Sequence, residues 1–160
     1  MDTYYSRPDV DFMETVQCLR VRERDGFAEI TYKPASNAAT HNTADIITKP
    51  ETNVSIGADQ AKQANQLLAA IGMMQLARVA KTRIALRHPH HDTVTVAIDT
   101  IAGVGSFVET EVLTDDAAGI DELLEETEHL CGFHQLPVVH LPYRDLVMQH
   151  DQTQPVAPTT

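Results

Sequence analysis

Positively charged side chains recur at every second position in segments that alternate apolar and polar residues. Such alternation is typical of β-strands, where every second side chain points to the same face. Eight of the twelve Lys and Arg residues lie in such segments, although the formal net charge is −11. An acidic protein that gathers its cations on strands is expected to form a local site for an anion. These residues are Arg20, Arg22, Arg24, Lys33, Lys49, Lys81, Arg83 and Arg87.

Carboxylates follow the same spacing later in the chain. Glu109 and Glu111 share one face of the segment FVETEVL, and Asp99 lies on the polar face of the preceding segment, DTVTVAID. The spacing predicts that both glutamates reach the same region. Alternating charges more often form a face that water covers, and the spacing alone favours that interpretation.

Three histidines, His88, His90 and His91, resemble a metal-binding cluster at first sight. They occupy a short turn that Pro89 interrupts, and such a turn favours a solvated loop over a set of ligands. We do not count them as metal ligands.

The composition describes a soluble globular chain. Its 160 residues are enough for one domain with a core, and 42% of them are hydrophobic. The net charge of −11 argues against nucleic acid as a partner, because binding there depends on Lys and Arg. No apolar run approaches the ~18 residues of a membrane helix, and the start resembles no signal peptide, so we expect a cytoplasmic protein.

The first half of the chain predicts a hairpin followed by a helix. The segment from Cys18 to Lys33 alternates on both sides of Asp25-Gly26, a strong signal for a tight hairpin turn. Residues 34–43 have the composition of a loop, and a short strand is expected at 44–49, before Pro50. Apolar residues at helical spacing predict a helix over 58–75.

The second half predicts another hairpin, a third strand and a helix. Residues 78–87 and 92–99 alternate around the histidine turn, and the strand at 107–113 follows a glycine-containing turn. Thr114 is a suitable N-cap for a helix from Asp115 to Cys131, and Gly132 suits its C-terminal end.

The predicted elements describe an α+β protein with helices packed outside antiparallel strands. The sheet is expected to be either an antiparallel β-barrel or an open curved sheet, and a barrel would enclose the charged face. The strands that carry Arg20, Lys33, Arg83, Asp99 and Glu109 are expected to belong to one sheet. We expect one domain over residues 1–150 and a flexible tail over 151–160.

An ordered set of short motifs resembles the CYTH superfamily, the triphosphate-tunnel proteins that include class IV adenylate cyclases and triphosphatases. The chain contains DTYYSRP, then LRVR, TYK and KTR, and finally DTIAGVGSFVETE. These motifs extend over nearly the whole chain in the order of the family, and the later HLPYRDLV resembles its closing segment.

The resemblance implies a role for each matching residue. Guanidinium and ammonium groups would bind the phosphate oxygens of a triphosphate, and carboxylates would bind Mg²⁺ or Mn²⁺, which prefer oxygen ligands. The residues implied for phosphate are Arg20, Arg22, Lys33, Lys81 and Arg83, and those implied for the metal are Asp99, Glu109 and Glu111.

Two features depart from the family pattern. The opening E-x-E-x-K strand, which would supply metal-binding carboxylates, does not precede Asp2. The family's R-x-E-x-E falls on Lys49, Glu51 and Asn53, which keeps one cation and one carboxylate. We therefore expect either an open sheet or a homodimer that covers the unpaired edge.

Three functions stay open at this point. The resemblance is greatest to class IV adenylate cyclases, which convert ATP to cyclic AMP and pyrophosphate. A triphosphatase that hydrolyses an organic or inorganic triphosphate would need the same cations and carboxylates. An inactive module that binds triphosphate or polyphosphate would lack the opening strand.

Overall fold

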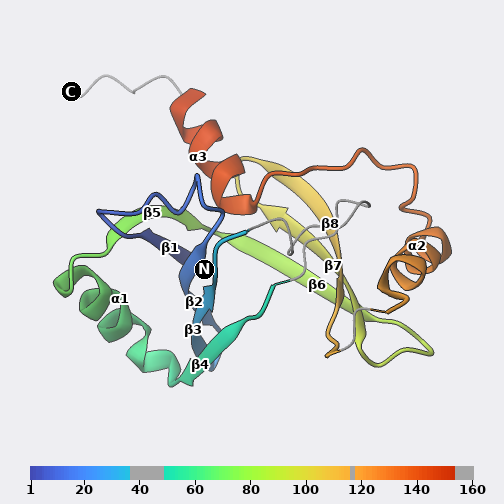
Figure 1. Cartoon of the computed structure of the whole chain (residues 1–160), viewed down its shortest axis with the longest axis horizontal. Coiled ribbons are helices and arrows are strands. Elements are labelled where there is room, and N and C mark those ends of the chain that lie inside the picture. Colours follow the sequence, from blue (N-terminus) through green and yellow to red (C-terminus); the bar gives the residue numbers. More distant parts are fainter. Residues whose placement is uncertain (37–48, 116–117, 154–160) are drawn as a thin grey trace. The chain divides into compact units, whose positions relative to one another are not determined.

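The computed structural model describes residues 1–36, 49–115 and 118–153, and these form two compact units (Figure 1). The first unit comprises Met1–Ala80 together with Leu141–Thr160, and the second comprises Lys81–His140. The chain therefore leaves the first unit after Ala80 and returns to it at Leu141.

A five-stranded antiparallel sheet forms the frame of the first unit. Its strands lie in the order β4-β3-β2-β1-β5. The predicted hairpin at Asp25-Gly26 is confirmed, since Arg24 pairs with Phe27 and Gly26 has a φ of +72°. The strands are β1 (Asp2–Ser6), β2 (Cys18–Arg24), β3 (Phe27–Lys33), β4 (Thr52–Ile56) and β5 (Met74–Val79).

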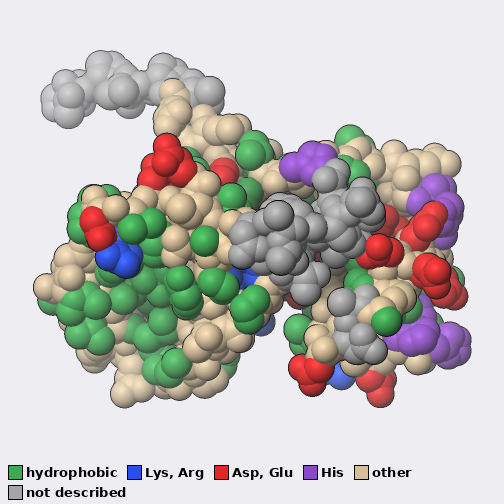
Figure 2. Space-filling view, in the orientation of Figure 1, with side chains coloured by type: hydrophobic (Ala, Val, Ile, Leu, Met, Phe, Trp, Pro, Cys, Tyr) green, Lys and Arg blue, Asp and Glu red, His purple; other side chains and the backbone are tan. Residues whose placement is uncertain are grey.

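The core of this unit lies between the sheet and helix α1 (Ala61–Ala70), which follows the short 3-10 helix η1 (Ala58–Gln60). Ala61, Ala64 and Leu68 of α1 pack against buried side chains of the strands, among them Val21 and Ala28. Leu67 and Ile71 belong to the same predicted apolar stripe but are 59% and 66% exposed. Figure 2 shows hydrophobic side chains gathered over the part of this unit where Figure 1 places α1.

The predicted helix over 58–75 is too long at its C-terminal end. The helix ends at Ala70, and β5 already begins at Met74. Gly72, whose φ is +90°, lies between them in a conformation that ends a helix readily. The prediction was too long because apolar residues continue past Gly72, where they belong to β5 and not to the helix.

Three further elements of this unit were not predicted. All five residues of β1 are buried, so β1 has no alternation to reveal it. β4 follows Pro50, whereas the strand expected at 44–49 lies, apart from Lys49, outside the described residues. Helix α3 (Tyr143–Thr153) packs against β5 and includes the first three residues of the expected tail.

The second unit is built on a three-stranded antiparallel sheet in the order β6-β7-β8. The predicted hairpin around the histidine turn is confirmed, with Arg87 paired to Thr95. The segment expected as one strand over 78–87 is divided at Ala80 between β5 and β6, two strands of different sheets. The strands are β6 (Lys81–Arg87), β7 (Val94–Ile101) and β8 (Gly105–Val112).

Helix α2 (Ile120–Cys131) contacts β8 and begins later than predicted. Its N-cap is Gly119, not Thr114, so the expected start at Asp115 is wrong. The predicted C-terminal end is confirmed, because Gly132 adopts the left-handed conformation with a φ of +74°.

The α+β class with antiparallel strands and helices packed on them is confirmed. The expectation that all charged strands share one sheet is wrong for the described residues, where β2 and β3 belong to one sheet and β6, β7 and β8 to another. None of the described helices is both long and apolar enough to span a membrane.

Candidate functional site

Strand register places the predicted cations of the first unit on one face of its sheet. Arg22 pairs with Asp2 on one side and Glu29 on the other, and Arg20 pairs with Tyr4 and Thr31. Because side chains alternate between faces, these residues lie opposite the apolar face that α1 covers. The same β-strands thus build a core on one face and a charged surface on the other.

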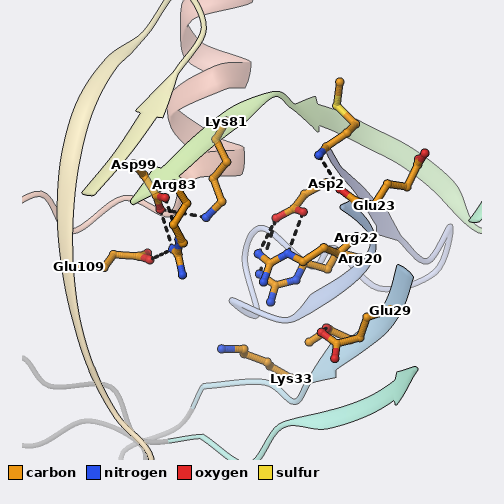
Figure 3. A network of polar contacts seen from close by, with 12 residues as sticks. Asp2, Arg20, Arg22, Glu23, Glu29, Lys33, Lys81, Arg83, Asp99 and Glu109 are labelled. Atoms are coloured by element: carbon orange, nitrogen blue, oxygen red, sulfur yellow. Dashed lines mark hydrogen bonds and ion pairs between the residues drawn. The ribbon is translucent and has the colours of Figure 1, made fainter. Parts of the chain in front are cut away.

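Arg22 is held by Asp2 in a bidentate ion pair. Its Nε donates to Oδ1 of Asp2 at 2.9 Å, and its Nη2 donates to Oδ2 at 2.6 Å (Figure 3). Both residues are buried, at 8% and 2% exposure. A buried fork of this kind uses two of the five N–H donors of the guanidinium and fixes its plane, so Arg22 is anchored by Asp2.

Arg20 is less completely paired. Its Nη1 lies 3.9 Å from Oδ2 of Asp2 and its Nη2 lies 3.7 Å from Oε1 of Glu51. Its Nε is buried and has no hydrogen-bond partner among the described residues. Burial raises the pKa of the neighbouring Tyr4 to about 12, against the lowering effect of Arg20, so this phenol stays neutral. The Nε of Arg20 is therefore free to donate a hydrogen bond to an anion.

Lys33 completes the cluster in this unit. Its Nζ lies 2.8 Å from Oε2 of Glu51, which connects it to Arg20 through the same carboxylate. Burial alone would raise the pKa of Glu51, but the hydrogen bond and charge of Lys33 outweigh it, so the pKa is lowered.

The other two residues of the departing R-x-E-x-E segment have different contacts. Asn53 accepts a hydrogen bond from Thr31, and Lys49 donates to the carbonyl of Val16 at 2.6 Å. Lys49 is thus directed to the backbone of the loop before β2.

The second unit brings its five predicted site residues together on one sheet. Arg83 pairs with Asp99 in the register of β6 and β7, and donates from Nε to Oδ1 at 2.7 Å and from Nη2 to Oδ2 at 2.6 Å. Lys81 donates to the same Oδ2 at 2.9 Å. Arg83 also donates to Glu109 (Figure 3). Its Nη1 lies 3.7 Å from Oε1 of Glu111.

Asp99 is the centre of this second cluster. Its side chain is fully buried, and both of its oxygens accept hydrogen bonds. Burial alone would raise its pKa, but the hydrogen bonds from Arg83 and Lys81 outweigh it and lower the pKa to about 2. Hydrogen bonding to Asp99 is the largest cause that raises the pKa of Arg83, whereas burial lowers the pKa of Lys81.

The carboxylates differ in their suitability for a metal ion. Glu109 and Glu111 have side chains that are 39% and 51% exposed, and oxygen donors of this kind fit Mg²⁺ or Mn²⁺. Asp99 would first have to exchange one of its hydrogen bonds, because Arg83 and Lys81 occupy both of its oxygens. Among the residues that the structure describes, no three or more His, Cys, Asp or Glu side chains are already arranged to hold a metal.

The histidine turn is only partly the solvated loop that was expected. His90 and His91 are exposed, but His88 is buried at 8% exposure and accepts a hydrogen bond from the backbone of His90. Its ring centroid lies 4.8 Å from that of His91.

Sequence reasoning missed two residues that position the first cluster. Asp2 anchors Arg22, and Arg144 of α3, which is 3% exposed, donates to the carbonyl of Gln17 at 3.0 Å. Both lie within motifs of the family resemblance, the opening DTYYSRP and the closing HLPYRDLV. No alternation marks either residue, because one lies on a fully buried strand and the other on a helix.

The fold and the site together define the class of this protein. It is an α+β protein whose antiparallel sheets carry paired cations and carboxylates on one face. The CYTH domain model matches residues 1–134. The chain belongs to the CYTH domain family.

Individual relatives support the same assignment. A protein of Methanocaldococcus jannaschii that is named as a candidate adenylate cyclase is 27% identical over 125 residues, which cover 78% of this chain. The match spans just under two thirds, 66%, of the length of that relative.

Solved structures share the fold. A protein of Pyrococcus horikoshii has a TM-score of 0.76 and 26% identity, with 92% of this chain and 82% of that chain covered. A candidate adenylate cyclase of Vibrio parahaemolyticus has a TM-score of 0.67 and 19% identity, with 91% and 78% covered. A candidate adenylyl cyclase of Hippeastrum has a TM-score of 0.58 and 13% identity, with 82% and 73% covered.

Proposed function

We propose that this chain binds a nucleoside or inorganic triphosphate and acts on it with Mg²⁺ or Mn²⁺ as a class IV adenylate cyclase. One observation carries the proposal: buried and half-buried cations on the strands are paired with carboxylates. Lys81, Arg83 and Asp99 form one such group. Cations that are desolvated in advance bind an incoming anion strongly, because little water has to be removed from them.

Phosphate oxygens would replace carboxylates as the partners of these cations. Arg83 would turn part of its guanidinium from Glu109 and Glu111 to a phosphate, while its fork to Asp99 keeps it oriented. Glu109 and Glu111, once released, would hold the metal, which supplies charge neutralisation for the phosphates when it is bound. Arg20 and Lys33, both paired with Glu51, would exchange partners in the same way.

In the cyclase reaction the ribose 3′-oxygen of ATP attacks the α-phosphorus. The bond from this phosphorus to the bridging oxygen of the β-phosphate breaks, pyrophosphate leaves, and the 3′-hydroxyl proton passes to solvent. The resemblance to class IV cyclases and the name of the Methanocaldococcus jannaschii relative support this choice.

A triphosphatase is the second candidate, and a specific finding favours it. The Hippeastrum neighbour is described as having a dominant triphosphatase activity, although it is named as a candidate adenylyl cyclase. In that reaction water attacks the terminal phosphorus, so the same cations and metal would serve. A module that binds triphosphate without turning it over is the third candidate.

Product analysis separates the three candidates. The protein is incubated with ATP and, separately, with tripolyphosphate, each with Mg²⁺ or Mn²⁺, and the products are resolved by anion-exchange chromatography. Cyclic AMP and pyrophosphate formed from ATP support the cyclase. ADP and phosphate formed from ATP, or pyrophosphate and phosphate formed from tripolyphosphate, support the triphosphatase. Binding without any product leaves the inactive module, and the absence of both product and binding would reject the proposal.

Matched variants connect any activity to the clusters. Arg83→Met should abolish turnover, whereas Arg87→Met, an exposed arginine on the same face of β6, should leave it unchanged. Lys33→Met, in the first unit, serves as a second test if Arg83→Met folds poorly. Equal activity in all three variants would mean that Arg83 and Lys33 do not bind the substrate.

The proposal includes a cytoplasmic location, where ATP is available, and self-association through a sheet edge. β4 is an outer strand of the described five-stranded sheet, and Val54 on it is 52% exposed. Exposed edges recruit another strand readily. Light scattering that finds only monomers would contradict the proposed self-association.

A further inference from the structure

A cavity of about 470 Å³ lies in the first unit, between α1 and the strands beneath it. Thr3 and Tyr5 of β1 line it, whereas Asp2 of the same strand faces Arg22 on the opposite side of the sheet. Alternation along β1 therefore separates this cavity from the cation cluster described above. The cavity is large enough for a small organic molecule.

Three charged side chains line the cavity, two positive and one negative. Lys62 of α1 and Arg78 of β5 are exposed, and Glu23 of β2 is half-buried. None of these three side chains forms an ion pair with any residue that the structure describes. The cavity thus carries one excess positive charge in a chain whose net charge is −11. This balance suits a ligand with a single negative charge.

The interior combines a fixed polar group with apolar walls. The hydroxyl of Tyr5, which is 3% exposed, donates to Oδ1 of Asn65 at 2.7 Å. Burial raises the pKa of Tyr5, and of the two charged residues that line the same cavity, Arg78 lowers it and Glu23 raises it. Ala69 and Met73 supply the apolar wall. A rigid polar anchor beside an apolar wall is typical of small-molecule sites.

We propose that this cavity is a binding site for a small organic monocarboxylate with an apolar body. Arg78 and Lys62 bind the carboxylate, the Nδ2 of Asn65, whose amide is held by the Tyr5 hydroxyl, orients it, and the apolar body lies against Met73. Glu23 disfavours polyanions, so the site discriminates against the triphosphate of the proposed function. The inference depends on charges without ion-pair partners in a cavity that none of the predicted phosphate-binding cations lines. It holds whether or not the chain turns over ATP.

Benzoate is a suitable probe, with benzamide as its neutral isostere. We expect benzoate to shift the backbone amide resonances of Thr3, Asn65 and Arg78 saturably in the full chain, with a dissociation constant on the order of 1 mM for so small a ligand. Benzamide should bind more weakly. The amides of Arg83 and Asp99 should not move, which distinguishes this site from the phosphate-binding residues.

Variants test the charges with opposite expected signs. Arg78→Met should weaken benzoate binding about tenfold or more, since it removes a charge-assisted hydrogen bond. Glu23→Gln should tighten it, and Arg87→Met should have no effect. Thermal unfolding of each variant verifies that the fold is kept. Shifts that do not saturate, equal binding of benzamide, or weaker binding by Glu23→Gln would each overturn the proposal.

Discussion

At the scale of single residues, the cations and the carboxylates should respond differently to metal. Arg20→Ala and Lys81→Ala should each weaken tripolyphosphate binding by about 1.5–3 kcal/mol, because each removes charge-assisted hydrogen bonds. The loss should be the same with or without Mg²⁺. Glu109→Ala should weaken binding only when Mg²⁺ is present and should leave metal-free binding equal or slightly stronger, because a carboxylate repels an anion.

Isothermal titration of each variant with and without Mg²⁺ measures this difference. Arg87→Ala serves as the control for a lost cation on the same strand as Lys81. Equal losses in all three site variants, independent of metal, would mean that Glu109 supports the fold and holds no ion.

Arg22 belongs to a different class from the other cations, because it is buried in a bidentate pair with Asp2. Arg22→Ala should lower the free energy of unfolding by about 3 kcal/mol, since the buried Asp2 would lose its bidentate partner and keep the longer contact with Arg20. Urea denaturation measures the loss, and Arg24→Ala, at an exposed position of the same strand, should cost much less. If both variants were equally stable, the buried pair would have no structural role.

Asp99 gives the second cluster a pH dependence at the acid end. Its pKa is lowered to about 2 in the folded protein, below the value near 3.9 of an unfolded aspartate. The unfolded state therefore binds the proton first, and the stability contributed by Asp99 is complete above about pH 4 and is lost as pH falls towards 2. Acid denaturation of Asp99→Asn should be flatter over this window than that of the parent protein. Identical acid transitions would contradict the assignment.

At the scale of elements, the sequence predicted the strands whose two faces differ. The hairpins around Gly26 and around His88–Asp92 were recognised because one face is charged and the other apolar. β1 was missed because both of its faces are buried, and the first four residues of β5 were missed because its apolar residues extend the helical spacing of α1. Alternation identifies strands only where a sheet separates core from water.

The same reasoning limits what could be predicted of the site. The spacing of Glu109 and Glu111 and of Arg20 and Arg22 placed each pair on one face, as found. The partner of each cation depends on strand order and register, which join residues as distant as Asp2 and Arg22. No local pattern contains that information, and only the family resemblance pointed to the segment around Asp2.

The end of α2 offers a test of its backbone conformation. Gly132 has a φ of +74°, and an added Cβ would meet no atom within 4 Å. Gly132→Ala should therefore destabilise the protein by about 1 kcal/mol through backbone strain alone. Gly132→Asn should cost less, because asparagine tolerates this conformation. Urea denaturation compares the two, and equal losses would contradict a backbone origin.

At the scale of the whole molecule, the net charge of −11 opposes the proposed anionic ligand. Figure 2 shows acidic side chains over much of the second unit. A triphosphate approaching from afar is repelled, although the local cations attract it at short range. The Debye length falls from about 30 Å at 0.01 M salt to about 8 Å at 0.15 M. Stopped-flow association with a fluorescent ATP analogue should therefore become faster as salt is added, and a slower rate would contradict this account.

The division of the chain at Ala80 and Leu141 affects the order in which the protein can mature on the ribosome. The second unit is one continuous segment, so its hairpins can form as soon as they are synthesised. The first unit must wait, because α3, which packs against β5, is made after the entire second unit. During that interval the surface of β5 that α3 will cover is exposed to solvent, and the nascent chain is most open to aggregation there.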